Sequence, residues 1–170
     1  MINIFGKLKN YGLLEIIVFS SLVYVISMLL WTVSTRSAVE ERANIVKSNH
    51  KSIVDFINNE INYCESSDDK SKTKWGDLCK KEWSSKKIVN YINSQMNLKN
   101  PYSSNGNIIK LAQDPRLQAE GKAGQSTEMG VIFLSSKNIG SEPGSEWIVG
   151  TCIKSPCVAA GNNELSSVYR

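Results

Sequence analysis

The chain has 170 residues, of which 41% are hydrophobic and 21% are charged. This length suffices for one small globular domain and is too short for two domains together with a membrane anchor. The net charge of +4 is too small for a dedicated nucleic-acid-binding protein, which concentrates basic residues on one face. One histidine, His50, and four cysteines exclude a His-rich metal centre. We therefore predict no enzyme, no cofactor and no metal site.

An apolar segment near the N-terminus is the strongest feature of the sequence. Ile16 to Thr35 contains 20 residues without a charge, between Glu15 and Arg36. As a helix rising ~1.5 Å per residue it spans ~30 Å, the thickness of the hydrocarbon core of a bilayer. The preceding residues 1–12 carry two lysines and no acid. The positive-inside rule therefore places the N-terminus in the cytoplasm and the rest of the chain outside.

A cleaved secretory signal is the alternative for this segment. The apolar run is longer than the ~7 to 15 residues of a signal-peptide core, and the arginine within Thr35–Ala38 makes a poor cleavage site. Two interpretations of Glu15 also stay open. It is either an acid solvated among lipid headgroups or a charge that pairs with another group in an assembly.

The helical pattern continues beyond the apolar segment. No Pro or Gly occurs between Leu13 and Tyr63, so the two parts can form one continuous helix of ~75 Å. Apolar residues three or four positions apart predict that the second part is amphipathic and buries one face. These residues are Val39, Ala43, Val46, Ile53, Val54, Ile57 and Ile61.

The composition changes after Cys64. Residues 65–85 are rich in Ser, Asp and Lys, which predicts a loop. Seven lysines lie between Lys70 and Lys87, with two tryptophans among them. The segment is either a solvated loop whose tryptophans pack on the domain or a salt-sensitive contact surface for a polyanion such as DNA. The candidate contact residues are Lys70, Lys72, Lys74, Trp75, Lys80 and Lys81.

A second, shorter helix is predicted over residues 86–98, because its apolar residues form one stripe and Asn100-Pro101 ends it. Residues 102–126 are rich in Gly, Asn and Ser and are expected to be mainly loop. Within them, residues 108–111 are a brief strand candidate and Asp114-Pro115 marks a turn.

Two further strands are predicted over residues 128–135 and 146–154, joined by a hairpin loop over residues 136–145. The sheet has one face to cover, and the amphipathic helix carries the long apolar stripe that can cover it. The predicted fold class is α+β, with a long N-terminal helix packed on a small antiparallel sheet.

The four cysteines are expected to form disulfides, because the domain is placed in an oxidising compartment. Three pairings are possible for four cysteines. We favour the local pattern, in which Cys152 pairs with Cys157 across a proline turn and Cys64 pairs with Cys79. A zinc site is the alternative, but the short C-x₂₋₄-C spacing expected on each arm is missing.

The segment Gly12-Leu13-Leu14-Glu15 follows a short basic leader and opens an apolar helix. Together with the amphipathic continuation, the small sheet and a C-terminal disulfide loop, it resembles the type IV pilins and pilin-like proteins. Members of this family usually have an aromatic residue after the leader glycine and a glutamate at the fifth mature position. Here cleavage between Gly12 and Leu13 makes Leu13 the first residue and Glu15 the third.

The resemblance implies a structural function. Residues 1–12 would be a leader removed by a prepilin peptidase, residues 13–36 the transmembrane and assembly half of the helix, and residues 37–170 a small extracytoplasmic domain. The subunit would wait in the inner membrane and then join other pilin subunits in a surface filament, with the help of the pilus assembly machinery. A methylated N-terminus and a register-setting role for Glu15 also follow from the resemblance.

Two other classes of function remain as alternatives. The first is a single-pass membrane-anchored binding or scaffold protein that does not polymerise. The second, an enzyme, lacks a motif: His50 is expected on the helix surface beside Lys51, and Asp77 on a loop. Asp68-Asp69 are expected to be solvated loop acids, with a weak calcium contact as the alternative. The pattern does not separate a major pilin from a minor pilin or a secretion pseudopilin, and the filament's surface ligand stays open.

Overall fold

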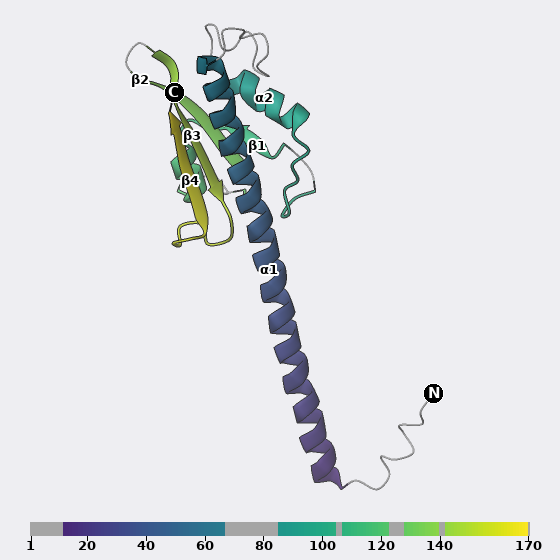
Figure 1. Ribbon diagram of the computed structural model, residues 1–170. Coiled ribbons are helices and arrows are strands. Elements are labelled where there is room, and N and C mark those ends of the chain that lie inside the picture. Colours follow the sequence, from purple (N-terminus) through teal and green to yellow (C-terminus); the bar gives the residue numbers. More distant parts are fainter. Residues whose placement is uncertain (1–11, 67–84, 105–106, 123–127, 140–141, 170) are drawn as a thin grey trace. The chain divides into compact units, whose positions relative to one another are not determined.

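The computed structural model describes residues 12–66, 85–104, 107–122, 128–139 and 142–169 (Figure 1). Contacts within the chain divide it into two compact units, Met1–Glu40 and Glu41–Arg170. Helix α1 (Leu13–Ser66) has 54 residues and contributes to both units. The predicted α+β class and the long apolar N-terminal helix are confirmed.

In the first unit, every described side chain of α1 is exposed. The absence of Pro and Gly from Leu13 onward lets the helix run without a break. Hydroxyl groups on the apolar stretch donate hydrogen bonds to backbone carbonyls one turn back, as in Ser20 to Ile17 at 2.9 Å and Ser27 to Val23 at 2.8 Å. These polar groups are therefore satisfied within the helix, which is what an apolar environment requires.

The second unit contains a four-stranded sheet in the order β1-β2-β3-β4. The strands are β1 (Ile109–Leu111), β2 (Ile132–Ile139), β3 (Glu142–Cys152) and β4 (Asn163–Tyr169). β1 runs parallel to β2, whereas β2, β3 and β4 are antiparallel. The predicted antiparallel pair is confirmed as β2 and β3. The sheet as a whole is mixed rather than antiparallel, because β1 and β2 are joined by a crossover that contains helix α3 (Pro115–Ala119) rather than by a hairpin.

The predicted strand boundaries also change. The loop expected over residues 136–145 is largely strand, since β2 and β3 extend toward each other until Ile139 pairs with Glu142. β4 follows the disulfide loop and was not predicted. The expected turn at Asp114-Pro115 is instead the start of α3. Asp114 is its N-cap, with the carboxylate accepting a 2.9 Å bond from the Arg116 N–H, and Pro115 occupies the first turn.

One face of the sheet packs against helices (Figure 1). Trp147 and Val149 of β3 are fully buried there with Ile53 and Ile57 of α1. Helix α2 (Ser85–Gln95), close to the predicted 86–98, adds further apolar residues to this cluster. Burying each large aliphatic side chain contributes about 1.5–3 kcal/mol, so this cluster is the main source of the unit's stability.

Helix α3 contacts β2, β3 and β4. Its first residue lies against Gly150, where a Cβ would collide with the Pro115 carbonyl group. Gly150 belongs to the face of β3 opposite Trp147 and Val149, because alternate residues of a strand point to opposite faces. The sheet is thus covered on one side by α1 and α2 and on the other by α3.

Candidate functional site

The N-terminus of α1 is closed by its own side chain. The Glu15 carboxylate accepts a 3.1 Å hydrogen bond from the Gly12 N–H. Gly12 is the N-cap residue and Glu15 the third helical residue, so this is the returning half of a capping box. The carboxylate also lies at the positive end of the helix dipole. Both effects act on the intact chain, before any cleavage at Gly12.

The surface of α1 that follows is apolar on all sides. Leu13 is 78% exposed and Trp31 is 74% exposed. Among the described residues, one helix is long and apolar enough to span a membrane, and its most apolar window contains no buried residue. A helix with this surface is stable in lipid or in a bundle of similar helices and is poorly soluble alone in water.

The expected position of His50 was wrong. Its side chain is 1% exposed rather than on the helix surface. The Nδ1 atom lies 3.0 Å from the Thr151 Oγ1 on β3, and the Nε2 atom lies 2.9 Å from the Ser166 Oγ on β4. Burial lowers the pKa of His50 to about 4. The neutral imidazole therefore connects α1 to two strands at neutral pH.

The hydroxyl–imidazole–hydroxyl chain superficially matches a nucleophile and its base. In a catalytic triad, however, a carboxylate orients the histidine and stabilises the imidazolium that forms. Thr151 supplies a hydroxyl at that position. The lowered pKa also makes His50 a weak base at neutral pH. The arrangement suits the packing of a helix on a sheet better than general-base catalysis.

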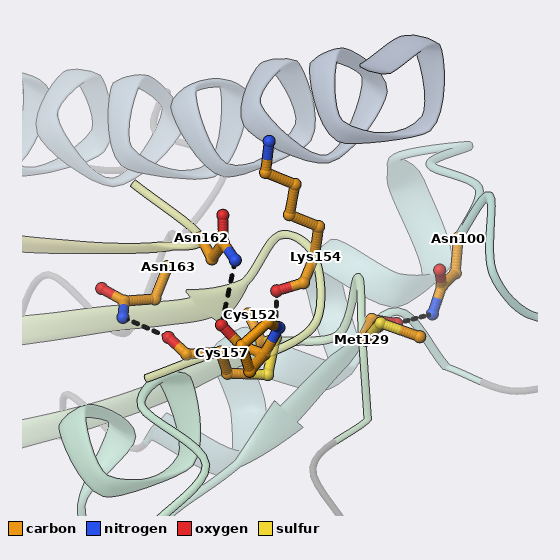
Figure 2. Close-up of a disulfide and its surroundings, with 8 residues drawn as sticks. Asn100, Met129, Cys152, Lys154, Cys157, Asn162 and Asn163 are labelled. Atoms are coloured by element: carbon orange, nitrogen blue, oxygen red, sulfur yellow. Dashed lines mark hydrogen bonds between the residues drawn. A yellow bond between two sulfur atoms is a disulfide. The ribbon is translucent and has the colours of Figure 1, made fainter. Parts of the chain in front are cut away.

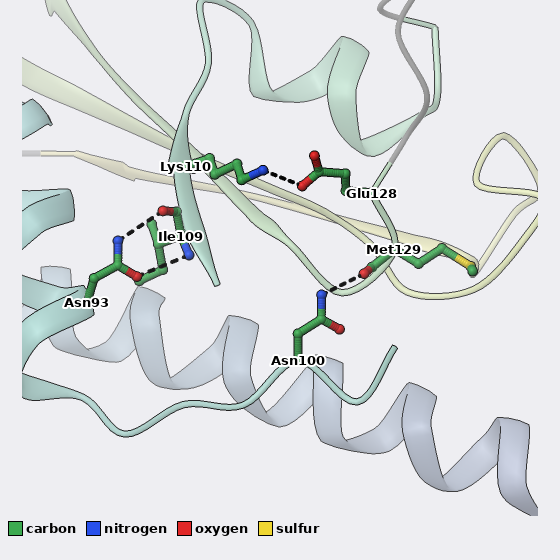
Figure 3. A network of polar contacts seen from close by, with 6 residues as sticks. All are labelled: Asn93, Asn100, Ile109, Lys110, Glu128 and Met129. Atoms are coloured by element: carbon green, nitrogen blue, oxygen red, sulfur yellow. Dashed lines mark hydrogen bonds and ion pairs between the residues drawn. The ribbon is translucent and has the colours of Figure 1, made fainter. Parts of the chain in front are cut away.

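Asparagine amides join the elements around this core. On α2, the Asn93 side chain donates to the Ile109 carbonyl at 3.0 Å and accepts from its N–H at 3.3 Å, so it occupies the hydrogen-bonding groups of β1 as a strand partner would (Figure 3). Asn100 donates to the Met129 carbonyl at 2.9 Å. A cavity of about 320 Å³ lies beside this network. Lys110 and Glu128 line the cavity, and their side chains form an ion pair at 2.6 Å.

The C-terminal loop is closed by the Cys152–Cys157 disulfide, which is the pairing expected for it (Figure 2). Asn162 donates to the Pro156 carbonyl at 3.0 Å, and Asn163 donates to the Cys157 carbonyl. The loop is thereby fixed to the start of β4. Cys64 is also disulfide-bonded. Its predicted partner, Cys79, lies outside the described residues.

The part of the lysine-rich segment over residues 67–84 also lies outside the described residues. It includes every candidate polyanion contact, namely Lys70, Lys72, Lys74, Trp75, Lys80 and Lys81. Asp68, Asp69 and Asp77 lie in the same segment. Polyanion binding and a calcium contact there stay predictions. In the part of the chain that the structure describes, no group of three or more His, Cys, Asp or Glu residues is placed to hold a metal ion.

Comparison of the chain with protein-family models, curated proteins and solved structures finds no match. The resemblance to pilins therefore rests on the residues and the element order described above.

Proposed function

We propose that the chain is a structural subunit of a type IV pilus or a related filament, held in the inner membrane by α1 before assembly. The proposal is based on the difference in exposure between the two parts of α1. Its described residues up to Glu40 are all exposed and mostly apolar, whereas from Ala43 onward one face belongs to the core of an α+β domain. A helix exposed in this way needs a partner of equal apolarity, which lipid and neighbouring helices both provide.

The internal hydrogen bonds of the helix support both locations. Thr32 and Thr35 donate to carbonyls one turn back at 2.8 and 3.0 Å, as the serines nearer the N-terminus do. Because these hydroxyls need no outside partner, transfer from lipid into a bundle of helices breaks none of their bonds. The same surface therefore serves a stored subunit and an assembled one.

In this proposal, removal of residues 1–12 changes the situation of Glu15. Cleavage after Gly12 removes the N–H that caps the carboxylate in the intact chain. It creates a positive amine on Leu13, two residues away. A lone carboxylate in a dry bundle costs several kcal/mol, so it would pair with its own amine or with that of a neighbouring subunit. The second pairing would set the stagger between subunits.

The proposal is tested by N-terminal sequencing of the protein from membranes and from material sheared off the cell surface. We expect sheared filaments that contain the chain and begin at Leu13. A Gly12→Val variant should stay in the membrane with its leader intact. Gly6→Val is the matched control in the same leader and should assemble. Recovery of the chain from membranes alone, beginning at Met1, would instead favour the single-pass anchored protein.

A further inference from the structure

His50 lies where the core of the second unit is divided. On its N-terminal side, Ala43 and Val46 form a small apolar cluster with Ile153. On its C-terminal side, Ile53 begins the main cluster. The imidazole between them is the side chain of α1 that hydrogen-bonds both Thr151 of β3 and Ser166 of β4. It is therefore a polar connection among three elements, enclosed by apolar residues on both sides.

The two hydrogen-bond partners of His50 are neutral hydroxyls, which offer a protonated imidazole less compensation than a carboxylate partner would. On the face of β3 turned toward α1, the residues are Trp147, Val149 and Thr151, none of which is ionisable in the acidic range. On β4 the one acid on this face is Glu164, which pairs with Thr151 across the ladder. One of its carboxylate oxygens is buried and accepts no hydrogen bond from the described residues.

The other charged groups on these elements are of both signs. The acids of α1 beyond its apolar segment are Glu40, Glu41, Asp55, Glu60 and Glu65, and β3 carries Glu142 and Glu146. The cations are Arg42, Lys47 and Lys51 on α1, Lys99 in the segment that binds Asn49, and Lys154 after β3, whose side chain extends toward α1 in Figure 2. A charge on His50 would therefore be placed at a buried position where both hydrogen-bond partners are neutral hydroxyls rather than carboxylates.

We propose that His50 is an acid-sensitive latch, whose protonation releases the turn of α1 around it from β3 and β4. Opening of this turn exposes the imidazole to water, where the charged form is solvated. The closed form excludes the charge. The two forms thus differ in their affinity for one proton, which is the requirement for a pH-driven shift between them. This inference does not depend on whether the chain polymerises.

The direction and size of the pH effect follow from the linkage between proton uptake by His50 and opening of the turn. Burial holds the pKa of His50 at about 4 in the closed form, and exposure returns it toward ~6.5. Above pH 6.5 both forms are neutral, and the latch contributes its full stability. As the pH falls from 6.5 toward 4, only the open form takes up the proton. At pH 4.5 the ratio of open to closed molecules should be roughly 50- to 100-fold higher than at pH 7.5.

Hydrogen exchange measured by mass spectrometry on the full chain in detergent micelles tests the latch. After correction for the intrinsic effect of pH on exchange, protection of amides in residues 46–57 should fall by roughly 50-fold between pH 7.5 and 4.5. His50→Gln, which cannot take up a proton, should lose this dependence. Lys51→Gln changes the adjacent exposed residue and should behave like the original chain.

An equal fall in His50→Gln would overturn the proposal. If that variant does not fold, NMR titration of the His50 imidazole in the original chain tests the proposal instead. The chain has a single histidine, so its NMR signal needs no further assignment. We expect a titration midpoint well below 6.5 that coincides with loss of protection in α1. A midpoint near 6.5 in the folded chain would mean that protonation does not open the turn.

Discussion

Gly150 of β3 lies directly against the backbone carbonyl group of Pro115, the first residue of α3. The two nearest atoms belong to the Pro115 backbone, so they cannot rotate away as a flexible side chain would. We predict that Gly150→Ala lowers the free energy of unfolding by about 1–3 kcal/mol through overpacking. Chemical denaturation followed by circular dichroism measures this change.

Gly161 provides the control for that substitution. It has a φ of +78°, but nothing lies within 4 Å of a Cβ added to it. Gly161→Ala therefore carries only the backbone strain of the left-handed region, about 1 kcal/mol. Equal stability of Gly150→Ala and the original chain would show that α3 does not pack on β3 in solution.

Thr151 is the partner of His50 that is fully buried. Replacement by Val keeps its shape and removes the hydroxyl, which leaves the Nδ1 atom of His50 without a partner. We expect Thr151→Val to destabilise the domain by about 1–3 kcal/mol at pH 7.5. Ser166→Ala should cost less, because Ser166 is half-buried whereas Thr151 is fully buried. Thr151→Ser retains the hydroxyl and should recover most of the loss.

The Cys152–Cys157 disulfide closes a loop with a sequence separation of five residues. In the chain-entropy model a loop of this length contributes about 2 kcal/mol to stability. The double variant Cys152→Ser, Cys157→Ser should therefore have a free energy of unfolding lower by about 2 kcal/mol, and its denaturation midpoint should fall accordingly. Ser155→Ala, an exposed position in the same loop, should leave the midpoint unchanged. A larger loss than the model gives would mean that the loop also organises β4.

Substitution of Glu15 distinguishes its role as a helix cap from its proposed role in assembly. Glu15→Gln removes the charge, and a glutamine at this helical position still accepts the Gly12 hydrogen bond. We expect normal insertion into the membrane and strongly reduced filament yield, measured by quantifying sheared surface material. Glu41→Gln removes a charge from an exposed position further along α1 and should assemble normally. Wild-type filament yield from Glu15→Gln would show that the charge does not set the register.

The periodicity of apolar residues predicted both main helices because a helix buries positions three or four apart, and this spacing is local information. The same spacing also contains a signal for His50. Val46, His50, Ile53 and Ile57 lie on one stripe, so the helical period alone places the imidazole on the buried face. Its two hydroxyl partners are 101 and 116 residues away, and no local pattern identifies them.

The missed strand has a different explanation. β4 is at the edge of the sheet, and four of its seven residues, Asn163, Glu164, Ser166 and Ser167, are polar without a regular alternation. The parallel pairing of β1 depends on the direction in which the crossover through α3 returns, which composition does not encode. The pair Asp114-Pro115 is typical of turns and also of helix starts, where the two residues serve as N-cap and first residue. The local sequence therefore does not distinguish the two.

β4 has a consequence for the order of events during synthesis. Ser166 and Val168 of β4, the strand that follows β3 in the chain, complete contacts with His50 and with the main cluster. Until they are available, β3 has an unpaired edge and the imidazole lacks one of its partners. Contacts between distant parts of a chain form slowly, because loop closure precedes any gain in packing. The core of the domain is therefore completed only when β4 has been synthesised and has paired with β3.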